Sequence, residues 1–252
     1  MSAVATAEPG IPFLRLLRVE LRKQVDTRAG AGLLIAIAAV SAATIVLQLW
    51  LLDPQGLTWE SLSAGASMGS SLLLPLIGII AATSEWSQRT ALQTFALEPR
   101  RTRVHLAKLL SAVAFGLVMV ALTYLVGAIV NVIGAIVFDG AGSWDVEPGQ
   151  VLATVLTVTI SILMGVAFGL ALLNTPIAIV AYLVLPTVMS VLGVIPALAD
   201  VVGWIDPGGA MVPMYDWSFT PEQWGKLATS LAVWVALPLA FGLWRTARRE
   251  VA

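Results

Sequence analysis

The sequence predicts an all-α membrane protein with six transmembrane helices, an N-terminal amphipathic interfacial helix and both termini in the cytoplasm. Only 12% of the 252 residues are charged, about half the share of a soluble domain, and several uncharged apolar runs are long enough to cross a bilayer. These runs do not alternate polar and apolar residues as the strands of a membrane barrel do. Helices are therefore the expected way to pair the backbone inside lipid.

The N-terminal segment divides into two parts. Residues 1–12 are expected to be a disordered leader, because they contain small residues and prolines and little apolar surface to bury. Residues 13–28 predict an amphipathic helix, since Arg15, Arg18 and Arg22 recur on one side and apolar residues take the other. Such a helix suits the headgroup layer of a membrane; a solvated leader is the alternative.

Residues 29–252 are expected to form one six-helix transmembrane domain. The segment 148–199 carries no charge, and as a single helix it would be about 78 Å long, over twice the hydrocarbon core of a bilayer. It must therefore fold back, and Asn174-Thr175-Pro176 is the strongest helix breaker near its middle. Residues 199–223 are expected to be a loop, and Thr220-Pro221 predicts the start of the last helix. The expected spans are 31–52, 62–83, 109–138, 151–173, 177–198 and 224–244.

The distribution of basic residues predicts the orientation. Six spans put both termini on the same side as the segment 83–108. That side carries thirteen of the fourteen Lys and Arg, and only Lys226 falls on the other. The positive-inside rule then assigns both termini to the cytoplasm.

Several kinds of chemistry are not expected. The predicted spans contain no Asp, Glu, Lys, Arg or His at membrane depth, which disfavours an ion- or proton-coupled transporter. There is no cysteine, and the lone His105 has no neighbouring ligands for a metal site. The chain also lacks a G-x-x-x-x-G-K-[ST] phosphate-binding loop. We therefore expect no enzyme activity, no cofactor or metal in this chain and no nucleic-acid partner. Energy for any uphill transport would come from another polypeptide.

The polar residues within the spans are uncharged, mainly with hydroxyl or amide side chains. Asn131 and Tyr124 are the candidates for lining a pathway, although such residues more often hold helices together. Gly65-x-Ser67-x-Gly69 matches a nucleophile elbow, but His105 is expected near the opposite membrane face. The same glycines form a close-packing motif, as do Gly165 and Gly169 in the fourth span.

The segment 83–108 is the one long charged stretch between the apolar runs. Glu85 and Arg89 have the spacing of a helical ion pair, and Ala91, Leu92 and Phe95 form a short apolar stripe. Pro99 disfavours helix at the residue before it. The segment therefore predicts a short helix followed by a basic elbow. This helix could dock into a groove on a partner protein or lie on anionic lipid, and the residues alone leave both open.

The motifs of this segment resemble the permease subunits of ABC-2 type ABC transporters. Glu85-Trp86 ends the second span, Thr90 and Pro99-Arg100-Arg101 follow, and Lys108 enters the third span. Members of the family often have Gly before the Thr, where this chain has Arg89. The resemblance implies a multi-pass subunit of the bacterial plasma membrane and a second permease copy or paralogue. It also implies an ABC ATPase that binds ATP and Mg²⁺, and contacts with membrane lipids.

In this resemblance the amphipathic helix is a connecting helix, and the segment 83–108 is the coupling helix of an exporter. The residues assigned to ATPase coupling are Glu85, Trp86, Arg89, Thr90, Leu92, Phe95, Pro99, Arg100, Arg101 and Arg103. A membrane scaffold or sensor without a translocation pathway is the main alternative. An intramembrane serine hydrolase that uses Ser67 is a more remote one.

Overall fold

The computed structural model describes residues 11–248, and every regular element in this range is a helix. Six of the helices are long and apolar enough to cross a membrane, as the sequence predicts. They are α2 (Arg28–Leu51), α3 (Trp59–Ser87), α5 (Arg101–Val137), α6 (Pro148–Leu172), α7 (Thr175–Leu192) and a last span, Pro221–Arg248, made of α11 (Pro221–Leu231), the turn η2 (Ala232–Ala236) and α12 (Leu237–Arg248). The expected leader lies outside the described residues, apart from its last two.

Shorter helices fill the connections. They are α1 (Phe13–Asp26), η1 (Pro54–Gly56), α4 (Ala91–Leu97), α8 (Ala199–Ile205), α9 (Pro207–Met211) and α10 (Pro213–Asp216). The expected loop at 199–223 is thus wrong in part, since three short helices occupy most of it. Pro207 and Pro213 each stand at the start of a helix, where the missing N–H has no intrahelical partner to lose. Thr220 caps α11, with Pro221 at the first helical position, as predicted.

The helix that contains the expected third span, 109–138, begins about two turns before it. Helix α5 starts at Arg101, so His105 and Lys108 lie inside it. The prediction ended the span where charges begin, but nothing in these residues breaks a helix once Pro99 has been passed. Helix α7 also differs, because it ends at Leu192 rather than near residue 198.

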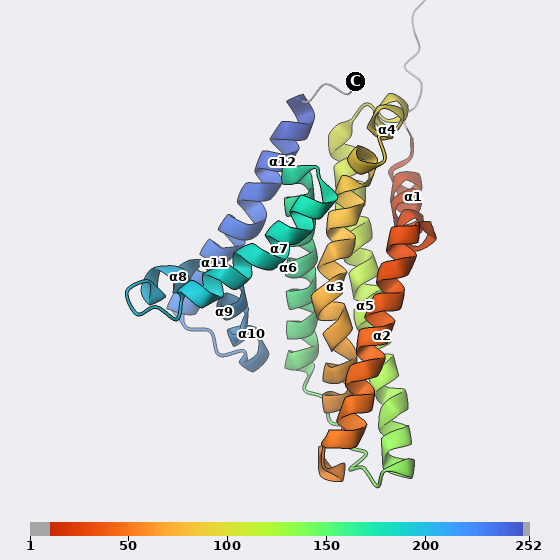
Figure 1. Cartoon of the computed structure of the whole chain (residues 1–252), viewed down its shortest axis with the longest axis vertical. Coiled ribbons are helices and arrows are strands. Elements are labelled where there is room, and N and C mark those ends of the chain that lie inside the picture. The colour runs from red at the N-terminus through yellow and green to blue at the C-terminus, as the bar shows by residue number, and fades with distance from the viewer. Residues whose placement is uncertain (1–10, 249–252) are drawn as a thin grey trace, which may run out of the picture.

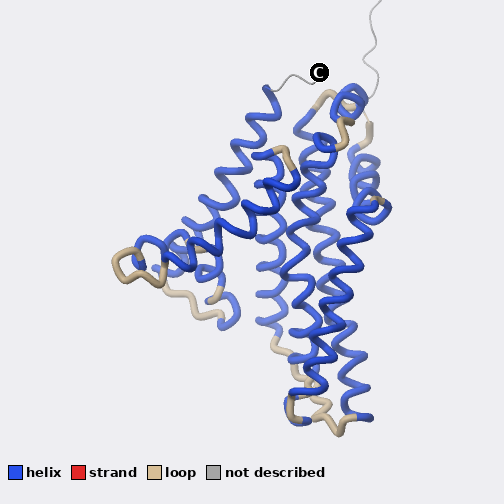
Figure 2. The backbone as a smooth tube through the Cα atoms, in the orientation of Figure 1, coloured by secondary structure: helices blue, strands red, loops and turns tan. Residues whose placement is uncertain are grey.

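Helix α3 is the centre of the bundle and packs against α2, α5 and α6 (Figures 1 and 2). Glycines make these approaches close. An ideal Cβ on Gly69 would lie 2.5 Å from the carbonyl oxygen of Ile37 on α2, and one on Gly165 would lie 2.2 Å from the carbonyl oxygen of Pro75 on α3. The predicted packing role of both glycine motifs is therefore confirmed.

A second group of helices leans away from this bundle. Figure 1 shows α7 and α12 diverging from α6, with α8, α9 and α10 at the foot of the divergence. Within the last span, residues Ala232–Ala236 form a π-helical turn that contains Trp234. The Trp234 ring stacks on Phe168 of α6, and its Nε1 donates to the carbonyl oxygen of Ile205 in α8. This ring thus joins α6, α8 and the last span.

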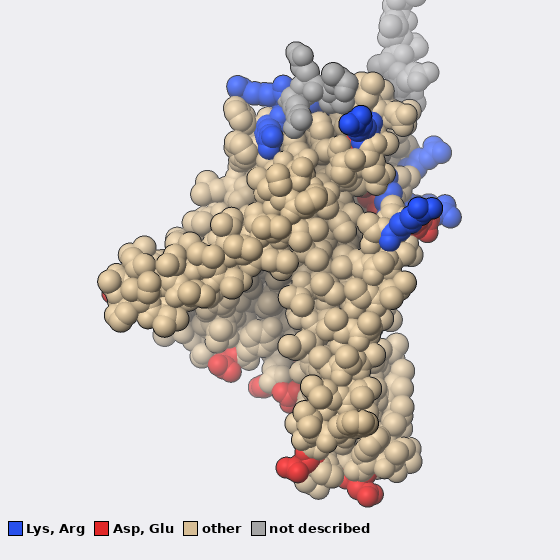
Figure 3. All heavy atoms as spheres, viewed as in Figure 1, with Lys and Arg blue, Asp and Glu red and all other residues tan. Residues whose placement is uncertain are grey.

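Charge is distributed unevenly along the molecule. Figure 3 shows Lys and Arg gathered at the end that carries α4 and the end of α12, and Asp and Glu mainly at the opposite end. We call these the basic end and the acidic end. Both ends of the described chain lie at the basic end, since Arg103 donates to the Ile11 carbonyl and Arg101 donates to the Thr246 carbonyl.

The close approach of α3 and α6 gives a matched pair of glycine variants. Gly165→Ala would drive a methyl group into the backbone of Pro75, whereas Gly32 on α2 has no atom within 4 Å of an ideal Cβ. We expect Gly165→Ala to destabilise the protein by about 1–3 kcal/mol, and Gly32→Ala to be neutral or stabilising by up to about 1 kcal/mol. Thermal unfolding of both variants in detergent checks this; similar melting temperatures would contradict the close packing.

Candidate functional site

A buried ion network joins α1, α3 and α5 near the basic end. At its centre is Lys108, whose side chain is 1% exposed. Its ammonium lies 2.6 Å from Oε1 of Glu85, 2.8 Å from the Ala81 carbonyl oxygen and 3.1 Å from Oε2 of Glu20. Three acceptors match the three protons of an ammonium group. The lysine is therefore fully hydrogen-bonded although it is buried.

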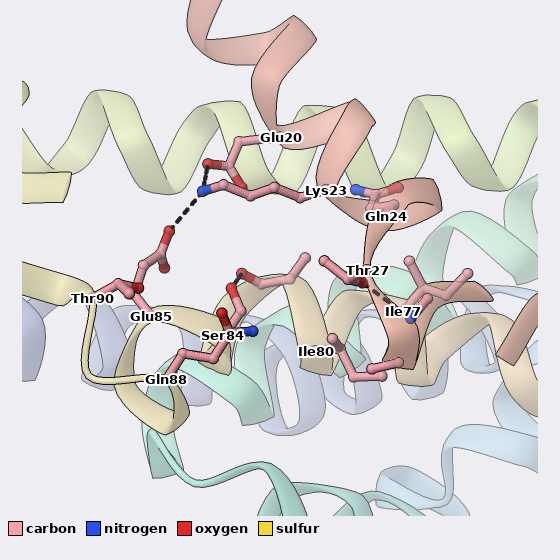
Figure 4. A pocket seen from close by; sticks show the side chains of 13 residues that line it. Glu20, Lys23, Gln24, Thr27, Ile77, Ile80, Ser84, Glu85, Gln88 and Thr90 are labelled. Carbon is pink, nitrogen blue, oxygen red and sulfur yellow. Dashed lines mark hydrogen bonds and ion pairs between the residues drawn. The ribbon is translucent and has the colours of Figure 1, made fainter. Parts of the chain in front are cut away.

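Lys23 completes the network from the solvent side. Its ammonium lies 2.7 Å from Oε1 of Glu20 and 3.1 Å from Oε1 of Glu85 (Figure 4). Burial alone would lower the pKa of Lys23, but the charges and hydrogen bonds of Glu20 and Glu85 outweigh it and raise that pKa. Two carboxylates and two ammonium groups thus share one site without net charge. Balanced pairing of this kind offsets the several kcal/mol that removing each ion from water costs.

A small cavity of about 120 Å³ adjoins the network between α1 and α3. Figure 4 shows Lys23, Gln24, Glu85 and Thr90 around it. The amide of Gln24 donates to the Ser111 hydroxyl at 2.9 Å, which adds a neutral link between α1 and α5. Helix α1 is therefore attached to the bundle by polar contacts on its inner side, not only by apolar residues.

Helix α4 lies next to this network and is fixed by an aromatic cluster. Phe95 and Ala91 are buried and pack with Val104 of α5 and with Trp86 of α3. The Arg101 guanidinium lies over the Phe95 ring, 4.9 Å from its centroid, and the His105 ring meets the same side chain edge-on. One face of α4 is thus an internal packing surface.

The basic elbow after α4 is closed by a second buried ion pair. Glu98 accepts from Arg103 at 2.8 Å and is itself almost fully buried, and its other oxygen accepts from the Arg100 backbone. Arg103 also donates to the Ile11 carbonyl oxygen at 2.9 Å. Together with the bond from Arg101 to α12, these contacts attach the elbow to both ends of the described chain.

Two expectations for this segment are wrong. Glu85 pairs with Lys23 and Lys108 instead of Arg89, because α3 ends at Ser87 and Arg89 turns the chain with a φ of 57°. This left-handed conformation favours glycine. The expected stripe also divides: Ala91 and Phe95 face the core, whereas Leu92 is 57% exposed. Spacing alone places these three residues on one side of a helix, but it does not show which of them are buried against the bundle.

The remaining predicted residues lie as follows. Helix α4 ends at Leu97, with Glu98 as its C-cap, in agreement with the break expected before Pro99. Arg15, Arg18 and Arg22 are exposed on α1. Thr90 lies between Arg89 and α4 and borders the small cavity.

The two residues expected to line a pathway, Tyr124 and Asn131, lie in different surroundings. Tyr124 lines a second cavity towards the acidic end, whereas Asn131 is buried and donates to the Ser143 carbonyl oxygen at 3.1 Å. Ser67 borders the same cavity as Thr123, and Thr123 is five turns of α5, roughly 27 Å, from His105. The hydroxyl of Ser67 and the ring of His105 therefore do not meet.

Sequence reasoning missed Glu20, Lys23 and Gln24. The repeat of Arg15, Arg18 and Arg22 on one side of the helix, with apolar residues opposite, leaves the other polar residues without a predicted side. Glu20, Lys23 and Gln24 recur at the i, i+3 and i+4 spacing that shares one helical face, and two of the three are buried. This second polar face was the signal that could have identified them.

Comparisons with known proteins add no relative: no family model, curated protein or solved structure matches the chain.

The ion network leads to a test by charge removal. Lys108→Met leaves Glu20 and Glu85 buried with a single lysine, and loss of one partner of a buried pair costs about 3–5 kcal/mol. The control Lys226→Met breaks the pair between Lys226 and Glu222, in which Glu222 is exposed, and should cost less than about 1 kcal/mol. Denaturant unfolding in detergent measures both.

A second substitution separates charge from packing. Adding Glu85→Gln to Lys108→Met removes one surplus carboxylate and should restore part of the lost stability. Equal effects of the two lysine substitutions, or no recovery in the double variant, would contradict the role given to the network.

Proposed function

We propose that the chain is the permease subunit of an ATP-driven exporter in the bacterial plasma membrane. In this proposal it forms the translocation pathway and receives energy through α4 from a separate ABC ATPase, which binds the ATP and Mg²⁺. A second permease copy or paralogue completes the pathway, and membrane lipid surrounds the assembly. The resemblance of Glu85-Trp86, Thr90, Pro99-Arg100-Arg101 and Lys108 to the ABC-2 type is the starting point.

The observation that carries the proposal is the outer face of α4. Leu92 and Leu97 are 57% and 72% exposed, at the basic end of the molecule, while Ala91 and Phe95 fix the opposite face to the core. Gln93 and Ala96 are also exposed on this face, between the two leucines. Such a face, with a leucine at each edge of a short helix, is suited to a groove of a partner protein. The aromatic cluster, the ion network and the ion pair of Glu98 with Arg103 would transmit a displacement of this helix to α1, α3 and α5 together.

Charge supports the orientation that this role needs. The basic end contains α4 and both ends of the described chain. Under the positive-inside rule this end faces the cytoplasm, where an ATPase would meet it. The hydroxyl-lined cavity that includes Tyr124 favours a pathway-forming protein over a scaffold with a filled interior.

A second subunit would have an available surface on α7. Most of this helix is exposed within the single chain, with Ile177 57% and Val180 59% exposed. An apolar groove along the same helix is lined by Pro176, Ile177, Val180 and Val184. Lipid or the second permease would cover these side chains in the assembly.

The orientation can be measured with single cysteines, since the natural chain has none. We expect a membrane-impermeant maleimide added to intact cells to label Ser143→Cys at the acidic end and to leave Leu92→Cys unlabelled. Permeabilised cells that lack the partner ATPase should show labelling of both. Labelling of Leu92→Cys but not Ser143→Cys in intact cells would reverse the proposed topology.

The coupling role is tested at the exposed leucines rather than at buried Phe95 or Glu85. Replacing Leu92 and Leu97 together by Ser removes apolar contacts without altering the core, and interface leucines of this kind contribute about 1–2 kcal/mol each. Binding of the cognate ATPase should fall at least about tenfold, measured by titration with the detergent-solubilised chain. Export in cells should fall with it.

The matched control is Leu52→Ser, which changes a leucine that is 40% exposed in the connection between α2 and α3. It should bind the ATPase normally. Unchanged ATPase binding and export by the Leu92 and Leu97 double variant would refute coupling through α4.

A further inference from the structure

A second cavity, distinct from the ion network, lies among α3, α5 and α6. Its volume is about 340 Å³, within the range of pockets that hold drug-sized ligands. From α3 it is lined by Glu60, Ser63, Ser67 and Ser70, which recur every three or four residues on one face. This face extends over roughly 15 Å of helix, from the acidic end towards the middle of the bundle. Tyr215 of α10 also borders it.

Two hydroxyl groups of the cavity lining, on Ser63 and Thr157, differ from those of Thr123 and Thr154 in their hydrogen bonding. Thr123 and Thr154, which also line it, donate to carbonyl oxygens one turn back on their own helices. Ser63, which is 3% exposed, and Thr157 have no hydrogen-bond partner for their hydroxyls among the described residues. A buried hydroxyl without a partner costs about 1–3 kcal/mol. The two groups lie on different helices of the lining, α3 and α6, and each keeps an unused hydrogen-bonding capacity.

The charge in the cavity has one sign. Glu60 is the charged residue among its lining groups, and within residues 11–248 no ion pair involves it. Tyr124 and Tyr215 add aromatic rings, whose faces attract cations. Val120 and Val158 provide an apolar wall. A carboxylate in partly apolar surroundings repels an anion and attracts a cation more strongly than it would in water.

We propose that this cavity binds an amphipathic amino alcohol, with its protonated amine at Glu60, its hydroxyl at Ser63 and Thr157, and its apolar body against the valines. Each part of this ligand matches a group in the lining. That such a molecule is also the exported cargo rests on the proposed function, whereas binding itself does not.

The test measures binding to the purified full-length chain in a non-ionic detergent, without any ATPase. Propranolol supplies the amine, the hydroxyl and the aromatic body. Naphthoxylactic acid keeps the ring system and the hydroxyl but has a carboxylate in place of the amine. Equilibrium dialysis should give at least tenfold tighter binding of propranolol to the chain than of the acid, after subtraction of the uptake by protein-free micelles.

Three variants locate the site. Glu60→Gln should weaken propranolol binding about tenfold, and Ser63→Ala about threefold, in proportion to a charge-assisted and a neutral hydrogen bond. The control Glu147→Gln makes the same change at an exposed acid near the start of α6, outside the cavity lining, and should bind normally. Circular dichroism and thermal unfolding confirm that each variant is folded.

The binding measurements either support or overturn the proposed amino alcohol site. Equal affinity for both probes, no binding of either, or full affinity in Glu60→Gln would overturn it and identify the cavity as a hydrated gap between helices. If Glu60→Gln does not fold, unchanged binding by Ser63→Ala overturns the proposal and weakened binding supports it. Because no ATPase is present, failure here leaves the coupling through α4 untouched, and failure of coupling leaves this binding result unchanged.

Discussion

The arrangement of the basic end depends on the hydrogen bonds of one ammonium group. Lys108 has three acceptors, and these come from α1 and from two positions on α3, so its position on α5 fixes three helices at once. Helix α1 is too short to be stable alone in water. Its place is defined by Glu20, Lys23 and Gln24, because each of these would be costly to bury against any other surface of the bundle.

The elbow after α4 is fixed by the same end of α5 that carries Lys108. Arg101, Arg103, His105 and Lys108 occupy the first turns of α5, so the aromatic cluster, the Glu98 pair and the ion network all share one rigid helix end. In the proposed coupling, a displacement of α4 would reach α5 through the aromatic cluster, and α1 and α3 through the ion network. Helix α3 also connects the two candidate sites, since it carries Glu60 in the hydroxyl-lined cavity near its start and Glu85 in the network near its end.

The six apolar helices and the glycine contacts could be predicted because they depend on the length of apolar runs and on residue size. The start of α11 could be predicted because Thr220 and Pro221 act locally. The ion network could not, since the sequence shows charges at the ends of spans but not which of them lie within reach of one another across 62 to 88 positions. Arg89 could be identified as the residue that differs from the motif which the segment resembles, but its left-handed conformation depends on where α3 ends. The division between Leu92 and Phe95 likewise depends on the contact of α4 with Trp86 and Val104.

The π-helical turn at Ala232–Ala236 has a geometrical consequence for the last span. A π-turn accommodates about one residue more than an α-helical turn, which offsets the angular position of later side chains by about 100°. The side of α11 that packs on α8 and α9 is therefore not in phase with the side of α12 that packs on α6. A single continuous helix thus presents two differently oriented packing surfaces, and the divergence of the leaning helices from the bundle is accommodated without a break in the backbone.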